Sequence, residues 1–116
     1  MARTLLVPVE LTRDGVRATA VAGTADGHKF PNTGREFLKL NNSNASVRVV
    51  TVVTQSTRDD QAVADREVTV TGSNYLITDV WPTDDYMVPS GTDLGMTYLN
   101  FPAGVESQVT VEVYYR

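Results

Sequence analysis

The sequence predicts an all-β protein, an antiparallel β-sandwich or jelly roll of about seven to eight short strands. Valine and threonine alternate with a period of two in several runs, as in residues 47–53, which is the spacing of side chains on one face of a strand. Clusters of Gly, Pro, Asn and Asp separate the runs at short intervals. No segment has the helical length needed to cross over between parallel strands.

Residues 4–11 form the first candidate strand. Pro8 interrupts this run, and because proline cannot donate to a central ladder, the segment is either an edge strand or part of an extended arm over residues 1–11. An arm of this kind would dock on a neighbouring subunit or protein. Its candidate contact residues are Leu5, Leu6, Val7 and Val9.

The next segment is poor in large apolar residues. Residues 12–27 are rich in Ala, Thr, Asp and Gly, and we expect a loop with one short strand near residues 17–21. The Pro-Asn-Thr-Gly cluster at 31–34 predicts a tight turn, because proline fixes φ while Asn and Gly tolerate positive φ.

Two hairpins are expected in the middle of the chain. An Asn/Ser-rich loop separates residues 36–41 from residues 46–54, and the composition predicts that the two runs pair antiparallel. A Gly-Ser-Asn loop similarly joins residues 67–71 to residues 75–79.

The remaining segments alternate between loop and strand. Residues 58–66 contain one large apolar residue, Val63, and therefore predict mostly loop with at most a turn or two of helix. Residues 82–95 predict a long surface loop, and residues 96–101 and 109–115 predict the last two strands.

Composition limits the classes of function. A chain of 116 residues that is 41% hydrophobic and 21% charged fits one domain over residues 1–116. The absence of cysteine excludes disulfides and thiolate metal sites and suits a reducing compartment. A net charge of −4 without basic runs argues against nucleic-acid binding. The apolar part of residues 1–10 is too short for a signal-peptide core or a membrane span.

No residue set predicts catalysis, a cofactor or a metal. His28 is the single histidine, and beside Gly and Lys, with only Asp26 nearby, it predicts a loop or surface residue. Three acids between residues 59 and 65 lack the spacing of a calcium loop and predict a solvated acidic loop. The adjacent Asp84 and Asp85 do not face one another as a catalytic acid pair must.

The aromatic residues after position 80 allow three interpretations. Trp81, Tyr86 and Tyr98 would form a stacking platform for a sugar if the fold gathered them. Alternatively, Trp81 caps the core. In the third interpretation residues 81–87 contact another protein, with Trp81, Tyr86 and Met87 as the contact residues.

Several stretches resemble small structural proteins of tailed bacteriophages. The chain opens with Met-Ala-Arg-Thr, as these proteins commonly do, and the similarity covers residues 25–42, 44–54 and 62–70. Its order is an Asn-Thr-Gly-Arg-Glu turn, an apolar strand, an Asn/Ser loop, a Val/Thr strand and Ala-Asp-Arg. The chain departs from the family pattern after Gly72, where Asp-Val-Trp-Pro stands in place of a Gly-Pro-Phe-like turn.

The resemblance implies a non-enzymatic virion protein of β-sandwich type, a head-decoration or minor capsid protein. Such a protein would be made in the bacterial cytoplasm, bind the major capsid protein on the capsid surface and form a homo-oligomer, with a trimer favoured. The alternatives are a phage tail or neck accessory protein and, from the aromatic residues, a carbohydrate-binding β-sandwich module.

Overall fold

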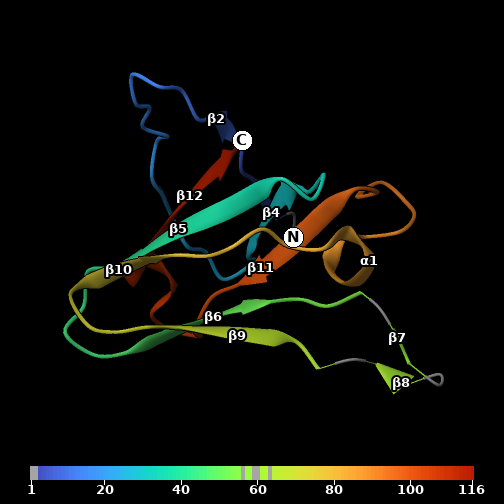
Figure 1. Cartoon of the computed structure of the whole chain (residues 1–116). Coiled ribbons are helices and arrows are strands. Elements are labelled where there is room, and N and C mark those ends of the chain that lie inside the picture. The colour runs from blue at the N-terminus through green and yellow to red at the C-terminus, as the bar shows by residue number, and fades with distance from the viewer. Residues whose placement is uncertain (1–2, 56, 59–60, 63) are drawn as a thin grey trace.

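A computed structural model describes residues 3–55, 57–58, 61–62 and 64–116, and strands dominate it (Figure 1). The expectation of an all-β fold is confirmed. The helical elements are α1 (Thr83–Tyr86) and one turn of 3-10 helix, η1 (Glu106–Gln108). The strands are β1 (Thr4–Leu5), β2 (Val9–Glu10), β3 (Val21–Ala22), β4 (His28–Pro31), β5 (Glu36–Asn42), β6 (Arg48–Val52), β7 (Thr57–Arg58), β8 (Gln61–Ala62), β9 (Arg66–Val70), β10 (Asn74–Ile77), β11 (Met96–Asn100) and β12 (Val109–Tyr115).

Ten of the strands form two five-stranded sheets. The first sheet has the order β1-β4-β11-β6-β9, and the second has the order β10-β5-β12-β2 with β3 also paired to β12. β7 and β8 form a separate two-stranded ribbon. The prediction of purely antiparallel sheets is wrong, because β1 runs parallel to β4 and β2 runs parallel to β12.

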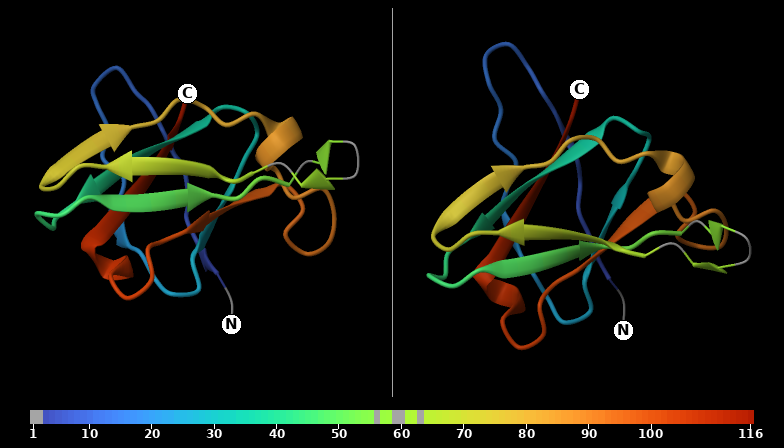
Figure 2. Two further views of the ribbon diagram at one scale, coloured as in Figure 1. Left: turned by 90° about the horizontal axis from the view of Figure 1, so that it is seen from below. Right: turned by 60° about the horizontal axis from the view of Figure 1, so that its bottom comes forward.

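Both sheets contribute to one hydrophobic core. Alternate residues of β5 and β12 are buried, as the period-two pattern predicts, and the same holds for β6 and β11. Figure 2 shows these strands from two further directions. The buried residues of the core are Leu6, Phe30, Leu38, Leu40, Val50, Val52, Val70, Trp81, Leu99, Val109, Val111 and Val113.

The first predicted hairpin is wrong. β5 pairs with β10 and β12, whereas β6 pairs with β9 and β11, so the Asn/Ser-rich loop passes from one sheet to the other. The buried side chain of Asn42 fixes this crossing, since its Nδ2 donates to the carbonyl oxygens of Ser46 (2.7 Å) and Val70 (3.2 Å). Its Oδ1 accepts the backbone N–H of Asn44 at 3.0 Å.

The second predicted hairpin is wrong for a related reason. β9 belongs to the first sheet and β10 to the second, so the Gly-Ser-Asn turn is another crossing. Gly72 packs so closely on the preceding crossing that a Cβ at this position would lie 1.9 Å from the carbonyl oxygen of Ala45. The backbone N–H of Ser73 donates to the carbonyl oxygen of Asn44 at 2.7 Å. The two crossings therefore brace one another.

The N-terminal segment is paired with its own subunit. β1 lies on the edge of the first sheet, β2 lies on the edge of the second, and Leu6 between them is buried in the core. Residues 4–10, here called the N-terminal strap, therefore connect the two sheets on one side of the molecule (Figure 1). Of the two predicted forms, the structure has the edge strands and not a free arm. The next predicted strand is shifted, and β3 begins at Val21.

The connecting segments are more ordered than expected. β7 and β8 occupy part of the segment predicted as mostly loop, while Val63 lies outside the described residues. The 82–95 segment contains α1 and the buried Val88, whose backbone N–H donates to the carbonyl oxygen of Met96 at 2.7 Å. The tight turn at 31–34 is confirmed, because the Asn32 side chain accepts the N–H of Gly34 at 2.9 Å.

Candidate interaction surface

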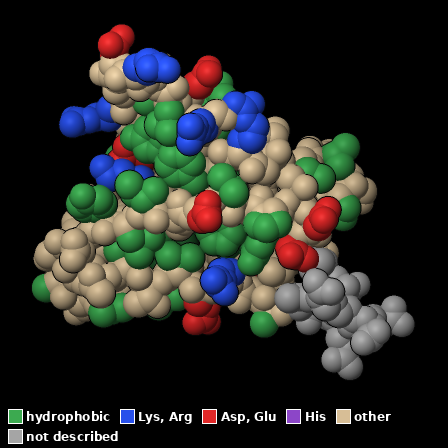
Figure 3. Space-filling model, viewed as in Figure 1, with side chains coloured by type: hydrophobic (Ala, Val, Ile, Leu, Met, Phe, Trp, Pro, Cys, Tyr) green, Lys and Arg blue, Asp and Glu red, His purple; other side chains and the backbone are tan. Residues whose placement is uncertain are grey.

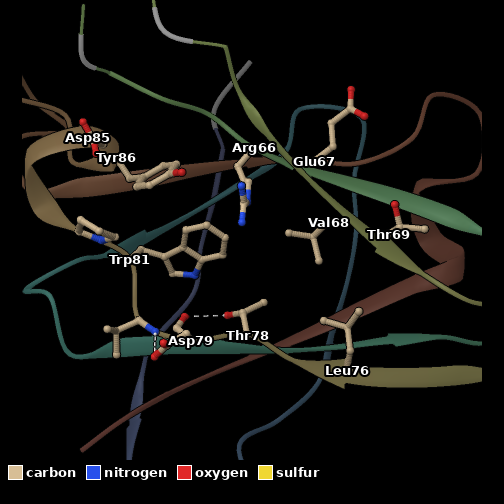
Figure 4. A pocket seen from close by; sticks show the side chains of 12 residues that line it. Arg66, Glu67, Val68, Thr69, Leu76, Thr78, Asp79, Trp81, Asp85 and Tyr86 are labelled. Atoms are coloured by element: carbon tan, nitrogen blue, oxygen red, sulfur yellow. Dashed lines mark hydrogen bonds between the residues drawn. The ribbon is translucent and has the colours of Figure 1, made fainter.

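A groove runs between β9 and β10, the outer strands of the two sheets on the side opposite the N-terminal strap. Figure 4 shows its side chains, which come from both strands and from the segment that leads into α1. The groove, called the β9/β10 groove below, has a volume of about 580 Å³. Its lining consists of Arg66, Glu67, Val68, Thr69, Leu76, Thr78, Asp79, Val80, Trp81, Pro82, Asp85 and Tyr86.

Trp81 belongs to both the core and the groove. Its side chain is only 7% exposed, and its ring meets that of Tyr86 edge-on, with the centroids 5.1 Å apart. The expectation that Trp81 caps the core is confirmed. The indole Nε1–H is buried and has no acceptor among the described residues, and an unsatisfied donor of this kind costs about 1–3 kcal/mol. The described residues therefore leave this hydrogen-bond donor of a groove-lining side chain unused.

The charged side chains of the groove are mostly acidic. Glu67, Asp79 and Asp85 stand against one cation, Arg66, which is exposed and makes no ion pair within the described chain. The one ion pair found among the described residues joins Lys29 to Asp93, with 2.7 Å between Nζ and Oδ1. A positively charged partner thus fits the groove better than a negatively charged one.

A second, smaller concavity lies on the strap side. It has a volume of about 300 Å³ and is here called the N-terminal hollow. Two of its side chains, Leu5 and Val7, are 51% and 73% exposed, whereas Leu6 points into the core. Its lining consists of Leu5, Leu6, Val7, Val9, Thr19 and Val21.

The structure divides the predicted contact residues between these two places. The four predicted strap residues line the N-terminal hollow together, and Trp81 and Tyr86 line the β9/β10 groove. Met87 is half-buried and lies outside the groove lining. Sequence reasoning missed Val68 and Leu76, because the predicted hairpin placed their strands side by side and left no groove between them. The sequence feature that could have indicated Val68 and Leu76 is that each is an apolar residue on the side of its strand that faces the core.

Tyr98 does not join the other two aromatic residues. Its hydroxyl donates to Asp93 Oδ2 at 2.5 Å, and the guanidinium of Arg3 lies 4.2 Å from the centre of its ring. The hydrogen bonds from Lys29 and Tyr98 lower the pKa of Asp93 from its usual value. The same bond to Asp93, together with burial, raises the pKa of Tyr98. The three-ring sugar platform is therefore not assembled.

The residues considered for catalysis or metal binding are dispersed. His28 was expected in a loop or on the surface, which is wrong, because it is fully buried on β4. Asp65 accepts hydrogen bonds from Thr54, while Asp59 and Asp60 lie outside the described residues. In the described part of the chain, no three His, Cys, Asp or Glu side chains gather as a metal site would need.

Comparison with known proteins identifies no relative of this chain. No protein family model, curated protein or solved structure matches this chain. Within the described residues, no helix combines the length and the apolar character required to cross a membrane.

Proposed function

We propose that this protein is a non-enzymatic structural protein of a tailed-bacteriophage virion. It binds the major capsid protein on the outside of the shell and braces neighbouring capsid subunits. The N-terminal hollow makes the contact with the capsid, and copies of the protein form a homo-oligomer on the capsid surface.

The rigid apolar surface of the N-terminal strap carries this proposal. Leu5 and Val7 are exposed although the strap is held at both ends, by β1 on β4 and by β2 on β12. Buried Leu6 anchors the segment between them. Exposed apolar side chains on a fixed backbone bind with little loss of conformational entropy, which favours a contact repeated over many symmetry-related sites.

The fold that we infer is a β-sandwich. Its support is the single core to which both sheets contribute and the two chain crossings at residues 43–47 and 71–73. The strap covers one open side of this double layer and leaves the β9/β10 side uncovered. Resemblance to phage structural proteins at residues 25–42, 44–54 and 62–70 supports the virion assignment.

Point substitutions in the hollow test the proposal. Deleting the strap would remove Leu6 from the core, so the informative change is Leu5→Asp combined with Val7→Asp. Capsids assembled from the major capsid protein of the same phage are mixed with the protein and sedimented, and bound protein is measured by gel densitometry. Because each lost apolar contact is worth about 1.5 kcal/mol or more, we expect at least about a tenfold loss of affinity.

A matched control uses two exposed apolar residues outside both concavities. Val47 and Leu94 are 52% and 60% exposed, and Val47→Asp with Leu94→Asp adds the same charge as the test variant. The control should bind capsids like the unmodified chain. Equal occupancy by all three proteins would refute the role of the hollow.

A tail or neck accessory protein is the second candidate. The same exposed strap would serve contacts within a tail or neck ring, so surface chemistry does not separate the two assignments. Copy number does, because a closed ring holds about a dozen subunits or fewer, whereas a decorated shell holds many more.

A further inference from the structure

The β9/β10 groove and a projecting loop carry complementary features on opposite sides of the subunit. We propose that residues 11–17 of one copy, called the 11–17 loop, dock in the β9/β10 groove of a second copy and join subunits head to tail. This inference deepens the proposed function by naming the contact between copies, and it rests on the homo-oligomer in that function. Its test in free solution is separate from capsid binding.

The 11–17 loop is a projection with a fixed base. Both of its ends are held by β12, since the N–H of Leu11 donates to the carbonyl oxygen of Tyr115 (2.9 Å) and the N–H of Ala18 donates to the hydroxyl of Tyr114 (3.2 Å). A turn closes its tip, where the N–H of Gly15 donates to the carbonyl oxygen of Thr12 at 3.1 Å. Figure 2 shows the loop standing away from both sheets.

The exposed side chains of the loop suit the groove. Every residue from 11 to 17 is exposed, including the apolar Leu11 and Val16. Arg13 and Arg17 make no ion pair with any described residue. Arg116 shares a shallow concavity with Arg13, and Arg35 lies 5.4 Å from the ring of Tyr115, so cations cluster around the base of the loop.

The surface around the loop is richer in basic side chains than the surface near α1. Figure 3 shows Lys and Arg side chains gathered where β12 ends and the loop projects, with some acidic side chains among them, whereas the charged side chains near α1 are Asp and Glu. The loop itself carries two arginines and one acid, Asp14. The groove supplies Glu67, Asp79 and Asp85 around an apolar floor. Arginines of the loop would pair with these carboxylates, and its apolar side chains would contact Trp81 and Val80.

The unused indole N–H of Trp81 is an independent sign of a missing partner. Figure 4 shows the indole between Arg66 and the stretch that contains Thr78 and Asp79. The side chain of Arg66 is exposed and makes no hydrogen bond or ion pair with any described residue, so it is free to turn away. A backbone carbonyl of the incoming loop would then accept the Trp81 N–H.

The sheet order determines the symmetry of this contact. β2, from which the loop departs, and β10, which borders the groove, are at opposite edges of the second sheet. A loop therefore cannot reach the groove of its own subunit, and the two surfaces of one copy must contact two different neighbours. Such a heterologous contact closes into a ring or continues as an open chain.

Charge reversal in two complementary variants tests the inference. One variant carries Arg13→Glu and Arg17→Glu in the loop, and the other carries Asp79→Arg and Asp85→Arg in the groove. Sedimentation velocity over a concentration series should show association of the unmodified chain that weakens as salt is added. Each variant alone should remain monomeric, because its loop and its groove then carry the same sign of charge.

Mixing the two variants gives the decisive result. The reversed loop fits the reversed groove, and the unmodified loop of the second variant fits the unmodified groove of the first, so association should return in the mixture. In the mixture the two variants must alternate, so a closed ring would need an even number of copies and could differ in size from that of the unmodified chain. The experiment therefore measures whether any species heavier than the monomer forms. Asp26→Arg, in the turn between β3 and β4, is the control and should associate like the unmodified chain.

A milder pair guards against variants that fail to fold. Asp79→Asn with Asp85→Asn keeps the side-chain shape, and we expect at least a tenfold weaker association. The chain has one tryptophan, so its indole N–H gives a single NMR signal, which should shift with protein concentration in the unmodified chain. A monomer at all concentrations, association that survives charge reversal, or a mixture that stays monomeric would each overturn the inference.

Discussion

His28 is the most deeply buried ionisable side chain of the described structure, with no exposed surface. Its Nε2 lies 2.9 Å from the carbonyl oxygen of Ala22, and since a carbonyl only accepts, this nitrogen carries the proton. The ring meets Phe101 edge-on, and Nδ1 has no partner among the described residues. Burial, with a smaller contribution from the charge of Arg3, lowers the pKa of His28 from its usual value of 6.5.

The lowered pKa predicts loss of stability in mild acid. Well above pH 6.5 the imidazole is neutral in both the folded and the unfolded state, so its protonation does not lower the stability there. As the pH falls through that value, the unfolded chain takes up a proton that the folded chain does not, and the free energy of unfolding decreases by at most about 1.4 kcal/mol per pH unit. The free energy of unfolding stops decreasing from this cause once the pH is below the pKa of His28 in the folded protein. Urea unfolding at pH 8, 6.5 and 5.5 measures this dependence.

Replacing His28 by glutamine separates the effect of histidine titration on stability from the effect of carboxylate titration. His28→Gln keeps an N–H donor for the Ala22 carbonyl and removes the titration. The difference in stability between the two proteins should therefore change over this pH range. Parallel pH profiles would contradict the assigned cause.

The strands were largely predictable from sequence, whereas their pairing was not. Period-two rows in β5, β6, β9, β11 and β12 give the strand positions, because each row buries one face. The same rows are equally consistent with two strands side by side in one sheet and with two strands in different sheets. Only contacts distant in sequence decide between these arrangements.

Two residues show what the sequence leaves open. Asn42 belongs by composition to a polar hairpin loop, but its buried amide binds the end of β9 through the Val70 carbonyl. Gly72 is equally typical of a hairpin turn. The structure requires glycine here for another reason, because a Cβ at this position would collide with the backbone of Ala45. Polar and glycine residues of this kind mark a reversal of the chain without saying which strand comes next.

The candidate surfaces were predicted in part. Apolar residues around Pro8 indicated the strap, and Trp81 with Tyr86 indicated the second surface. The groove itself depends on β9 and β10 being outer strands of different sheets, a relation that no local pattern contains. The projecting loop was predicted only as part of the loop over residues 12–27, because its fixed base comes from contacts with β12 that no local pattern contains.

Neighbouring residues of the strap should differ sharply in their effect on stability. Leu6 is buried in the core and Val7 is mostly exposed. Leu6→Ala should lower the free energy of unfolding by about 2–5 kcal/mol, because it leaves a cavity. Val7→Ala should change it by less than about 0.5 kcal/mol. Urea unfolding of both variants checks the expectation, and equal effects would show that the strap is not docked as described.

The whole subunit has two distinct sides. The strap covers one side of the two sheets and presents exposed apolar residues, while the other side is open at the β9/β10 groove. The proposed function assigns the strap side to the capsid, and the further inference assigns the groove to a neighbouring copy. In the proposed role, such a subunit would bind by adding many identical contacts over a symmetric shell.

Copy number in purified virions tests this role most directly. Quantitative mass spectrometry compares the amount of this chain with that of the major capsid protein in the same particles. A decorating protein predicts amounts comparable to the capsid subunit. About a dozen copies or fewer per particle, the number that fits one closed ring, would contradict the role on the capsid surface.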